Sequence, residues 1–164
     1  MMTPRTHTSL ALTLAAALTV TAQACSPAYV RDTKIAYSVE KQEIADMIER
    51  YRVALEARDV NALRGLTSDG YYENASTTDD PSDDYDAQGL DEVFGKLKRQ
   101  VKAVKYAIKI NAIDILDNTA AVDVEYSGQY LFTYDERDRW STHTDKNRIT
   151  LRREEGGWRI VSGL

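Results

Sequence analysis

The amino-acid sequence predicts an α+β domain in which helices pack on one face of an antiparallel sheet. Apolar side chains recur at helical spacing through residues 40–101, and they alternate with polar side chains through residues 104–161. Short turn-forming segments separate the alternating runs, so consecutive strands are expected to pair as hairpins. The chain has 164 residues, and we find no internal repeat and no second domain boundary.

Two helices are expected at the start of the domain. Between Glu40 and Arg58 apolar residues recur at three- and four-residue steps, which indicates one amphipathic helix. Ser38 is the expected N-cap of this helix. Asp59 ends it and can cap a second, short helix over residues 60–66, and residues 71–73 then form a candidate short strand.

A polar, acidic loop is expected next, over residues 74–88. Nine acidic residues and no basic residue lie between Gly65 and Gly95. Five aspartates mark this loop as a candidate lid: Asp79, Asp80, Asp83, Asp84 and Asp86. Their spacing lacks the glycine-centred pattern of an EF-hand, so we predict no metal site there, and a solvated loop is the alternative to a lid.

A third helix and four strands complete the predicted domain. The helix follows the acidic loop and carries Leu90, Phe94 and Leu97 on one face. The strands are expected at residues 104–110, 122–132, 140–154 and 158–161. The turns between them are expected at residues 117–118, 135–138 and 156–157. Alternation of apolar and polar side chains predicts that one face of this sheet is buried.

Residues 1–24 have the order of a secretory signal peptide. Arg5 precedes an uncharged run over residues 10–20, and Ala22 and Ala24 are small residues at the positions that a signal peptidase reads. The run is shorter than the roughly 20 residues that a membrane-spanning helix needs. A buried core helix is the alternative interpretation.

The single cysteine, Cys25, directly follows this segment, and residues 22–25 resemble a bacterial lipobox. The resemblance implies that Cys25 carries acyl chains and that residues 25–38 tether the domain to a membrane, although Ala22 stands where the signal usually has leucine. We therefore expect an exported protein of the cell envelope, an outer-membrane lipoprotein if the host is Gram-negative. Ordinary cleavage that leaves a free cysteine is the alternative.

The composition argues against several classes of function. A formal net charge of −5 and a pI of about 5.1 argue against non-specific nucleic-acid binding, which needs a basic surface. One cysteine and two histidines leave no set of residues for a disulfide framework or a cysteine-built zinc site. The sequence holds no glycine-rich phosphate loop, Gly-x-Ser-x-Gly elbow or His-Glu-x-x-His motif, and we predict no cofactor.

Two segments resemble the nuclear transport factor 2-like (SnoaL-like) superfamily. Residues 49–63 are similar to its first-helix motif, and residues 157–161 are similar to its final strand. The resemblance implies a cone-shaped domain over residues 39–164, in which three N-terminal helices pack on a curved antiparallel sheet and leave a pocket. This fold hosts isomerases, dehydratases, cyclases and non-catalytic proteins, so the resemblance predicts the fold rather than the activity.

Ketosteroid isomerases of this superfamily carry an oxyanion-stabilising tyrosine on the first helix, and Tyr51 falls at that position. Their catalytic aspartate lies just past the second helix, where an ungapped count from Tyr51 reaches Ala75. Asn74 precedes Ala75 and Glu73 is out of register, so this base is missing or displaced, and we do not predict steroid isomerisation. The alternative role for Tyr51 is a core tyrosine with a satisfied hydroxyl.

The remaining candidate pocket residues come from two long strands. His143, Asp145 and Asn147 share one face of a strand with the apolar residues that follow them, and this face is expected to point inward. Tyr126 and Tyr130 lie on the apolar face of the preceding strand. A histidine beside an acid can act as a general base, and the resemblance implies such chemistry, since related cyclases and dehydratases use pocket Asp and His residues. A strand end with solvated polar residues is the alternative.

Three functions remain open from the sequence. The first is a non-catalytic, envelope-anchored domain that binds a small hydrophobic ligand or a protein partner. The second is a cofactor-independent isomerase, cyclase or dehydratase that uses the pocket histidine, aspartate and tyrosines. The third is a self-associating module, because sheets of this superfamily commonly pair as homodimers. The missing isomerase base favours the first function over the second.

Overall fold

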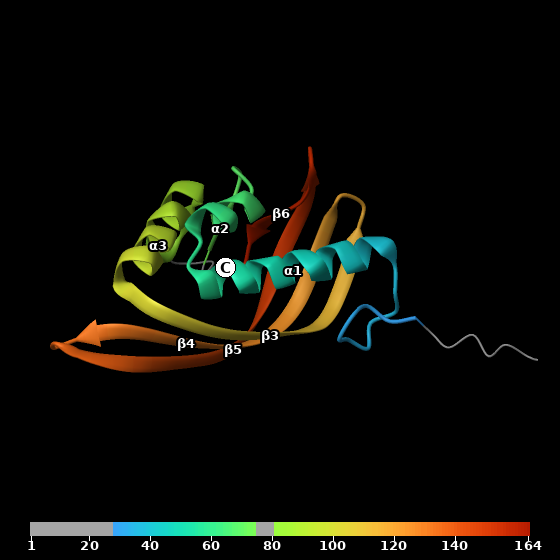
Figure 1. Cartoon of the computed structure of the whole chain (residues 1–164). Helices are drawn as coiled ribbons and strands as arrows, with labels where there is room; N and C mark the ends of the chain where they lie inside the picture. Colours follow the sequence, from blue (N-terminus) through green and yellow to red (C-terminus); the bar gives the residue numbers. More distant parts are fainter. Residues whose placement is uncertain (1–27, 75–80) are drawn as a thin grey trace, which may run out of the picture.

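The computed structural model describes residues 28–74 and 81–164, and it confirms the α+β fold class (Figure 1). Helix α1 lies along the inner face of a four-stranded sheet, α2 packs beside it, and α3 packs on α2 and on the sheet. The helices are α1 (Val39–Ala57), α2 (Val60–Leu66) and α3 (Ala87–Gln100). The strands of the large sheet are β3 (Val101–Leu116), β4 (Thr119–Tyr134), β5 (Arg137–Glu154) and β6 (Gly157–Ser162).

The large sheet has the strand order β3-β4-β5-β6, and every neighbouring pair is antiparallel. Positive φ angles at Asp117 and at Asp135-Glu136 close the first two hairpins, and Gly156-Gly157 closes the third. The second turn is therefore tighter than the four residues predicted, and β5 begins at Arg137.

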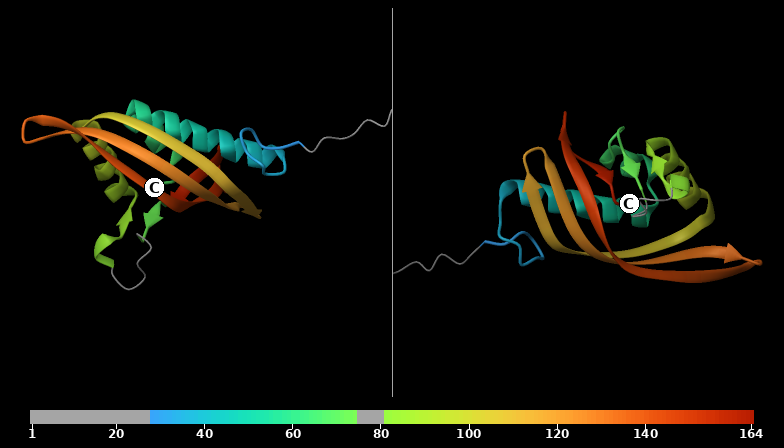
Figure 2. Two further views of the ribbon diagram at one scale, coloured as in Figure 1. Left: turned by 90° about the horizontal axis from the view of Figure 1, so that it is seen from below. Right: turned by 180° about the vertical axis from the view of Figure 1, so that it is seen from behind.

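The sheet curves around α1 (Figure 2). Register shifts interrupt the β3–β4 pairing near Val101 and again near Ile110, and such bulges bend a strand. The concave face and the inner side of α1 bury one continuous core, whose largest fully buried members include Ile44, Met47, Ile48, Leu151 and Ile160. Burial of this apolar surface is the main stabilising term of such a domain.

Side-chain caps set the helix boundaries. The Ser38 hydroxyl accepts a hydrogen bond from the Lys41 amide at 3.1 Å, and the Asp59 carboxylate accepts one from the Ala62 amide at 3.0 Å. Both predicted caps are confirmed. Asp86 caps α3 by accepting from the backbone amides of Gln88 and Gly89, each at 3.0 Å.

The prediction of a loop through residue 88 is wrong over its described part. A 3-10 turn (Pro81–Asp83) leads into β2 (Tyr85–Asp86), which pairs with β1 (Tyr72–Glu73), and α3 begins directly afterwards. The physical reason is local: Asp86 supplies the helix cap, and the Tyr85 ring stacks on the Tyr71 ring at 6.0 Å. Neither signal is part of a periodic pattern.

The segment before α1 is also folded. Residues 28–37 form a small hairpin, in which the Val30 amide donates to the Ile35 carbonyl at 2.9 Å. Val30 is 1 % exposed and belongs to the core. The described part of the predicted tether, residues 28–38, therefore packs on the domain.

The signal peptide over residues 1–24 and the lipidation of Cys25 lie outside the described residues and stay predictions. Within residues 28–74 and 81–164, no helix is long and apolar enough to span a membrane.

Candidate functional site

A small cavity of about 120 Å³ opens between α1 and the concave face of the sheet. Four tyrosines line it, together with Asn147, three apolar residues and the backbone of Gly163. The tyrosines are Tyr51, Tyr106, Tyr126 and Tyr130. The structure thus brings together four of the predicted pocket residues, namely Tyr51, Tyr126, Tyr130 and Asn147.

The register of β3 and β4 places these rings on one face. Tyr106 pairs with Gly128, and Tyr126 and Tyr130 lie two residues to either side of that glycine. A Cβ atom at position 128 would lie 2.8 Å from the Tyr130 ring. Gly128 therefore leaves the space that lets the Tyr130 ring fold across the strand.

The rings pack against one another in a chain. Tyr51 meets Tyr106 edge-on, with ring centroids 6.2 Å apart, and Tyr106 stacks on Tyr126 at 5.5 Å. The Tyr126 ring in turn lies 5.9 Å from the His143 ring. Such offset and edge contacts fix ring orientation, so the hydroxyls have defined positions.

All four phenols are held in their neutral form. Burial raises the pKa of Tyr51, and the neighbouring tyrosines add to the effect. Burial likewise raises the pKa of Tyr106, Tyr126 and Tyr130. Each hydroxyl is therefore a hydrogen-bond donor and acceptor at neutral pH and carries no charge.

None of these four hydroxyls has a hydrogen-bond partner among the described residues. The four hydroxyls are not among the buried polar atoms that lack a partner in the described residues, so they reach the open space of the cavity. A cavity lined by several unpaired phenols therefore favours occupation by water or by a ligand with polar atoms.

His143 and Asp145 lie outside this cavity. They do share the inner face of β5 with Asn147, because Asp145 pairs with Tyr126 and Asn147 pairs with Val124. His143 Nε2 lies 3.8 Å from Asp145 Oδ2, but the two side chains are 63 % and 62 % exposed. The expected convergence of this pair with the tyrosines in one closed pocket is thus not observed.

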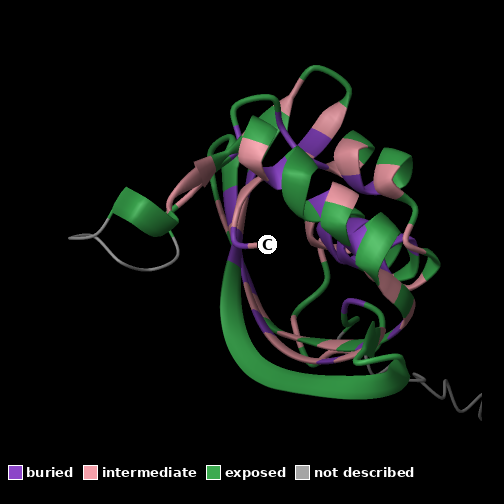
Figure 3. Ribbon diagram, turned by 90° about the vertical axis from the view of Figure 1, so that its left-hand side faces the viewer, coloured by how far each residue is buried: buried purple, intermediate pink, exposed green. Residues whose placement is uncertain are grey.

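The reason is the short reach of β6. This strand pairs with β5 only from Thr150 onward, so the β5 residues 137–148 are all exposed (Figure 3). Directly after β6, at Gly163, the chain turns away from its partner strand β5 with φ +91°. A Cβ at this position would lie 2.2 Å from the Arg148 carbonyl oxygen. Only glycine fits this departure.

The two residues after β6 cover one side of the cavity instead. The Leu164 amide donates to the Tyr71 hydroxyl at 3.1 Å, and the Leu164 carbonyl accepts from the Tyr85 hydroxyl at 2.8 Å. Asn147 Nδ2 donates to the Gly163 carbonyl at 3.2 Å. Leu164 also packs on the core, so it forms a wall that sequence reasoning missed.

Tyr106 is a further lining residue that sequence reasoning missed. It belongs to an alternating run that the sequence shows clearly, but nothing in that run distinguishes a pocket wall from core. The signal that could have identified it is its expected position opposite Gly128, a residue without a side chain in an otherwise bulky strand.

The acidic residues have local structural roles where the structure describes them. Asp84 accepts a hydrogen bond from the Tyr72 hydroxyl, and Asp86 caps α3. Asp83 ends the 3-10 turn, whereas Asp79 and Asp80 lie outside the described residues. In residues 28–74 and 81–164, no group of three or more His, Cys, Asp or Glu side chains gathers that could hold a metal ion.

Comparison with known proteins gives similarity in structure only. No family model matches the sequence, and no curated protein matches it. Among solved structures, a provisionally assigned scytalone dehydratase from Novosphingobium aromaticivorans has a TM-score of 0.64 at 15% identity, covering 76% of this chain and 81% of that one.

Two further structures lead to the same conclusion. A provisionally assigned dehydratase of the nuclear transport factor 2-like family from Streptomyces avermitilis has a TM-score of 0.59 at 12% identity, covering 76% of this chain and 93% of that one. A nuclear transport factor 2-like superfamily protein from Salmonella enterica has a TM-score of 0.58 at 17% identity, covering 75% and 87%. The chain has the nuclear transport factor 2-like fold that its sequence resembles.

Proposed function

We propose that this chain is an envelope-anchored lipoprotein whose domain binds a small ligand in the tyrosine-lined cavity without changing it chemically. One observation carries the binding role: four neutral phenols line one cavity, and none has a hydrogen-bond partner among the described residues. A ligand with a hydrogen-bond acceptor, such as a carbonyl or ether oxygen, fits these donors.

The size of the cavity limits the ligand. About 120 Å³ is well below the 300–1,000 Å³ of pockets that enclose drug-sized molecules. The cavity suits a small ring or the end of a longer molecule, and a larger ligand would need to displace Leu164 from its hydrogen bonds to Tyr71 and Tyr85.

The cavity lining also favours binding over catalysis. Among the described residues that line it, no side chain is a carboxylate or an imidazole, and burial disfavours the phenolates that could act as bases near neutral pH. The dehydratases among the structural neighbours share the fold with this chain, and a shared fold carries no activity.

One observation keeps an enzyme as the second candidate. The His143 ring lies 5.9 Å from Tyr126 and 3.8 Å (Nε2 to Oδ2) from Asp145, at the edge of the tyrosine cluster. A ligand that extended from the cavity onto β5 would meet this pair, and a cofactor-independent isomerase, cyclase or dehydratase could use it as a base.

A single probe distinguishes the two candidates. Cyclohexanone is a small ring whose oxygen accepts hydrogen bonds and whose α-hydrogens exchange with D₂O under base catalysis. We expect saturable binding by NMR titration, weakened several-fold by Tyr130→Phe and unchanged by Tyr134→Phe on an exposed part of β4. Absence of saturable binding would contradict a ligand role for the cavity.

The same sample reports on catalysis. Under the proposal, α-hydrogen exchange of cyclohexanone is no faster with the protein than with buffer. Faster exchange that is lost in His143→Gln would establish the second candidate instead. Native mass spectrometry of material from the natural host would give the mass of any retained ligand and of any acyl chains on Cys25.

A further inference from the structure

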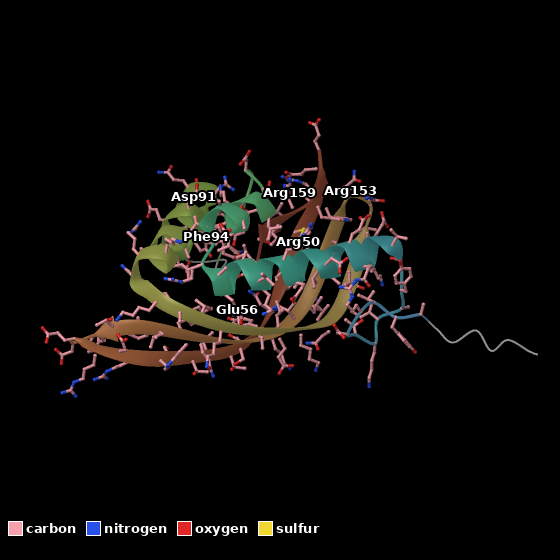
Figure 4. All side chains as sticks on the ribbon, in the orientation of Figure 1. Arg50, Glu56, Asp91, Phe94, Arg153 and Arg159 are labelled. Carbon is pink, nitrogen blue, oxygen red and sulfur yellow. The ribbon has the colours of Figure 1, made fainter. Side chains whose placement is uncertain are left out.

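A second hollow also borders α1 and shares no residue with the tyrosine cavity. It has a volume of about 440 Å³ and forms where α1, the end of α2 and the β5–β6 hairpin meet. Three arginines line it: Arg50 from α1, Arg153 from β5 and Arg159 from β6 (Figure 4). We call this hollow the arginine groove.

The arginine groove is positively charged in an acidic chain. Its lining holds three guanidinium groups and one carboxylate, Glu43, whereas the whole sequence has a formal net charge of −5. The low-dielectric walls of a hollow strengthen the potential of the charges that line it.

Only one of the three arginines is committed to acidic partners. Arg153 Nη1 lies 2.7 Å from Glu40 Oε1, and its Nη2 lies 3.7 Å from Glu43 Oε2. Its guanidinium also lies over the Trp158 ring, 5.4 Å from the ring centroid. Arg153 is thus held in place by these contacts, and the two carboxylates largely compensate its charge.

Arg50 and Arg159 are uncompensated at close range. Arg50 has no partner among the described residues, and Arg159 Nη1 donates only to the Trp158 carbonyl oxygen, at 3.2 Å. Glu154 interacts with Arg159 over a longer distance, but its close contact is with Arg152 at 2.7 Å. Two guanidinium groups therefore face one hollow without a carboxylate in contact.

Trp158 supplies an independent observation. Its side chain lines the arginine groove, the residue is 5 % exposed, and its indole nitrogen is buried without a hydrogen-bond partner among the described residues. The indole N–H is a donor only, so no acceptor offsets its positive end. A buried donor without a partner is uncommon in proteins.

We propose that the arginine groove binds a phosphate group, either inorganic or as a phosphomonoester. A phosphate dianion matches the charge of the two uncompensated guanidinium groups, and its oxygens accept the paired N–H bonds that a guanidinium offers. The volume of about 440 Å³ leaves room for the group to which the phosphate is attached. This site is separate from the proposed function and does not depend on it.

Intrinsic fluorescence tests the site directly. The chain has two tryptophans, so Trp140→Phe leaves Trp158 as the only tryptophan, within the groove. This variant is titrated with inorganic phosphate, with glycerol 3-phosphate, and with vesicles of phosphatidylcholine that contain phosphatidic acid. Sodium chloride at matched ionic strength is the reference, and calorimetry with the same ligands serves as a readout without a fluorophore.

We expect a saturable change that sodium chloride does not reproduce. Arg50→Gln and Arg159→Gln should each weaken the affinity about tenfold, since each removes a charge-assisted contact. Arg99→Gln, on an exposed position of α3, should leave it unchanged. Equal thermal midpoints of all variants would show that the losses are not losses of folding.

The ligand arms identify the source of the phosphate. Saturation by the two soluble phosphates identifies a free phosphate ester, and saturation by the acidic vesicles alone identifies a lipid headgroup; either supports the site. A response no larger than that to sodium chloride by both methods, or an affinity that both arginine variants retain, would overturn the proposal.

Discussion

The two halves of β5 differ sharply although they belong to one continuous strand. Residues 150–154 pair with β6, and Ile149 and Leu151 belong to the core, whereas residues 137–148 are exposed throughout and have β4 as their partner strand in the sheet. Both halves have the same register with β4, without interruption from Arg137 to Arg152. Register therefore orients side chains, whereas burial depends on which neighbouring elements reach them.

This difference separates the tyrosine cavity from the His143–Asp145 pair. The inner face of β5 is continuous along the strand, yet its buried residues all lie in the second half. Asn147 lies at the border, where it still contacts the Gly163 carbonyl and lines the cavity. Four predictions test how far the contrast between the halves extends.

The largest expected effect is on the packed half. Leu151→Ala removes a fully buried side chain and should lower the free energy of unfolding by about 2–5 kcal/mol. Thr142→Ala, on the exposed half, should change it by less than about 0.5 kcal/mol. Urea denaturation of both variants measures the contrast, and equal losses would mean that the exposed half is covered in solution.

Gly163→Ala should have the next largest effect, because it disturbs the point where the chain leaves β5. The new Cβ would meet the Arg148 carbonyl oxygen at 2.2 Å, and φ is +91°. We expect a loss of about 1–3 kcal/mol. Gly157→Ala is the control, because φ there is +120° but no atom lies within 4 Å of the added Cβ.

The outcome at Gly163 also reports on the cavity wall. If Leu164 is held by its hydrogen bonds to Tyr71 and Tyr85, Gly163→Ala should weaken these contacts. The cavity should then open, and cyclohexanone should bind more tightly or enter and leave the cavity faster. A variant as stable as the unmodified chain would show that the chain departs from β5 by another route.

Alkaline pH should destabilise the domain through the buried tyrosines. Burial raises the pKa of Tyr51 above its ordinary value of about 10. Below pH 10 the phenol is neutral in both states, and its contribution to stability is complete. Above pH 10 the unfolded chain releases the proton first, so the free energy of unfolding falls as pH rises.

Ultraviolet titration and urea denaturation between pH 8 and pH 12 check this prediction. Tyr51→Phe should flatten the alkaline loss of stability relative to the unmodified chain. Tyr134→Phe, on the exposed part of β4, is the matched control and should leave the loss as it is. A Tyr51 phenol that ionised at its ordinary pH would contradict the enclosed position described here.

The smallest expected effect is on the exposed half itself. Trp140 is 47% exposed, and its ring lies 5.0 Å from Lys105 Nζ, so Trp140→Ser should change stability by less than about 1 kcal/mol. Sedimentation analysis of the same variant tests the homodimer that the sequence leaves open as a third possibility. If the open edge of β5 pairs with a second copy, Trp140→Ser should weaken that association although it leaves folding intact.

Much of the fold could be read from the sequence because its signals are local. Helical spacing from Glu40, the caps at Ser38 and Asp59, and strict alternation along β3 and β4 each depend on a few neighbouring residues. The loop before α3 was misjudged because its short strand forms only with a partner at Tyr72–Glu73.

For the candidate site, too, some features follow from local sequence and others from tertiary contacts. The sequence by itself determined which residues share a face, because side chains alternate along a strand, and so it grouped His143, Asp145 and Asn147 correctly. It also placed Tyr126 and Tyr130 on the apolar face of the preceding strand. Only the tertiary structure decided which of these residues are enclosed, because burial depends on where β6 ends, on the turn at Gly163 and on the wall formed by Leu164. Those contacts join residues far apart in the chain, so no local sequence pattern predicts where they form.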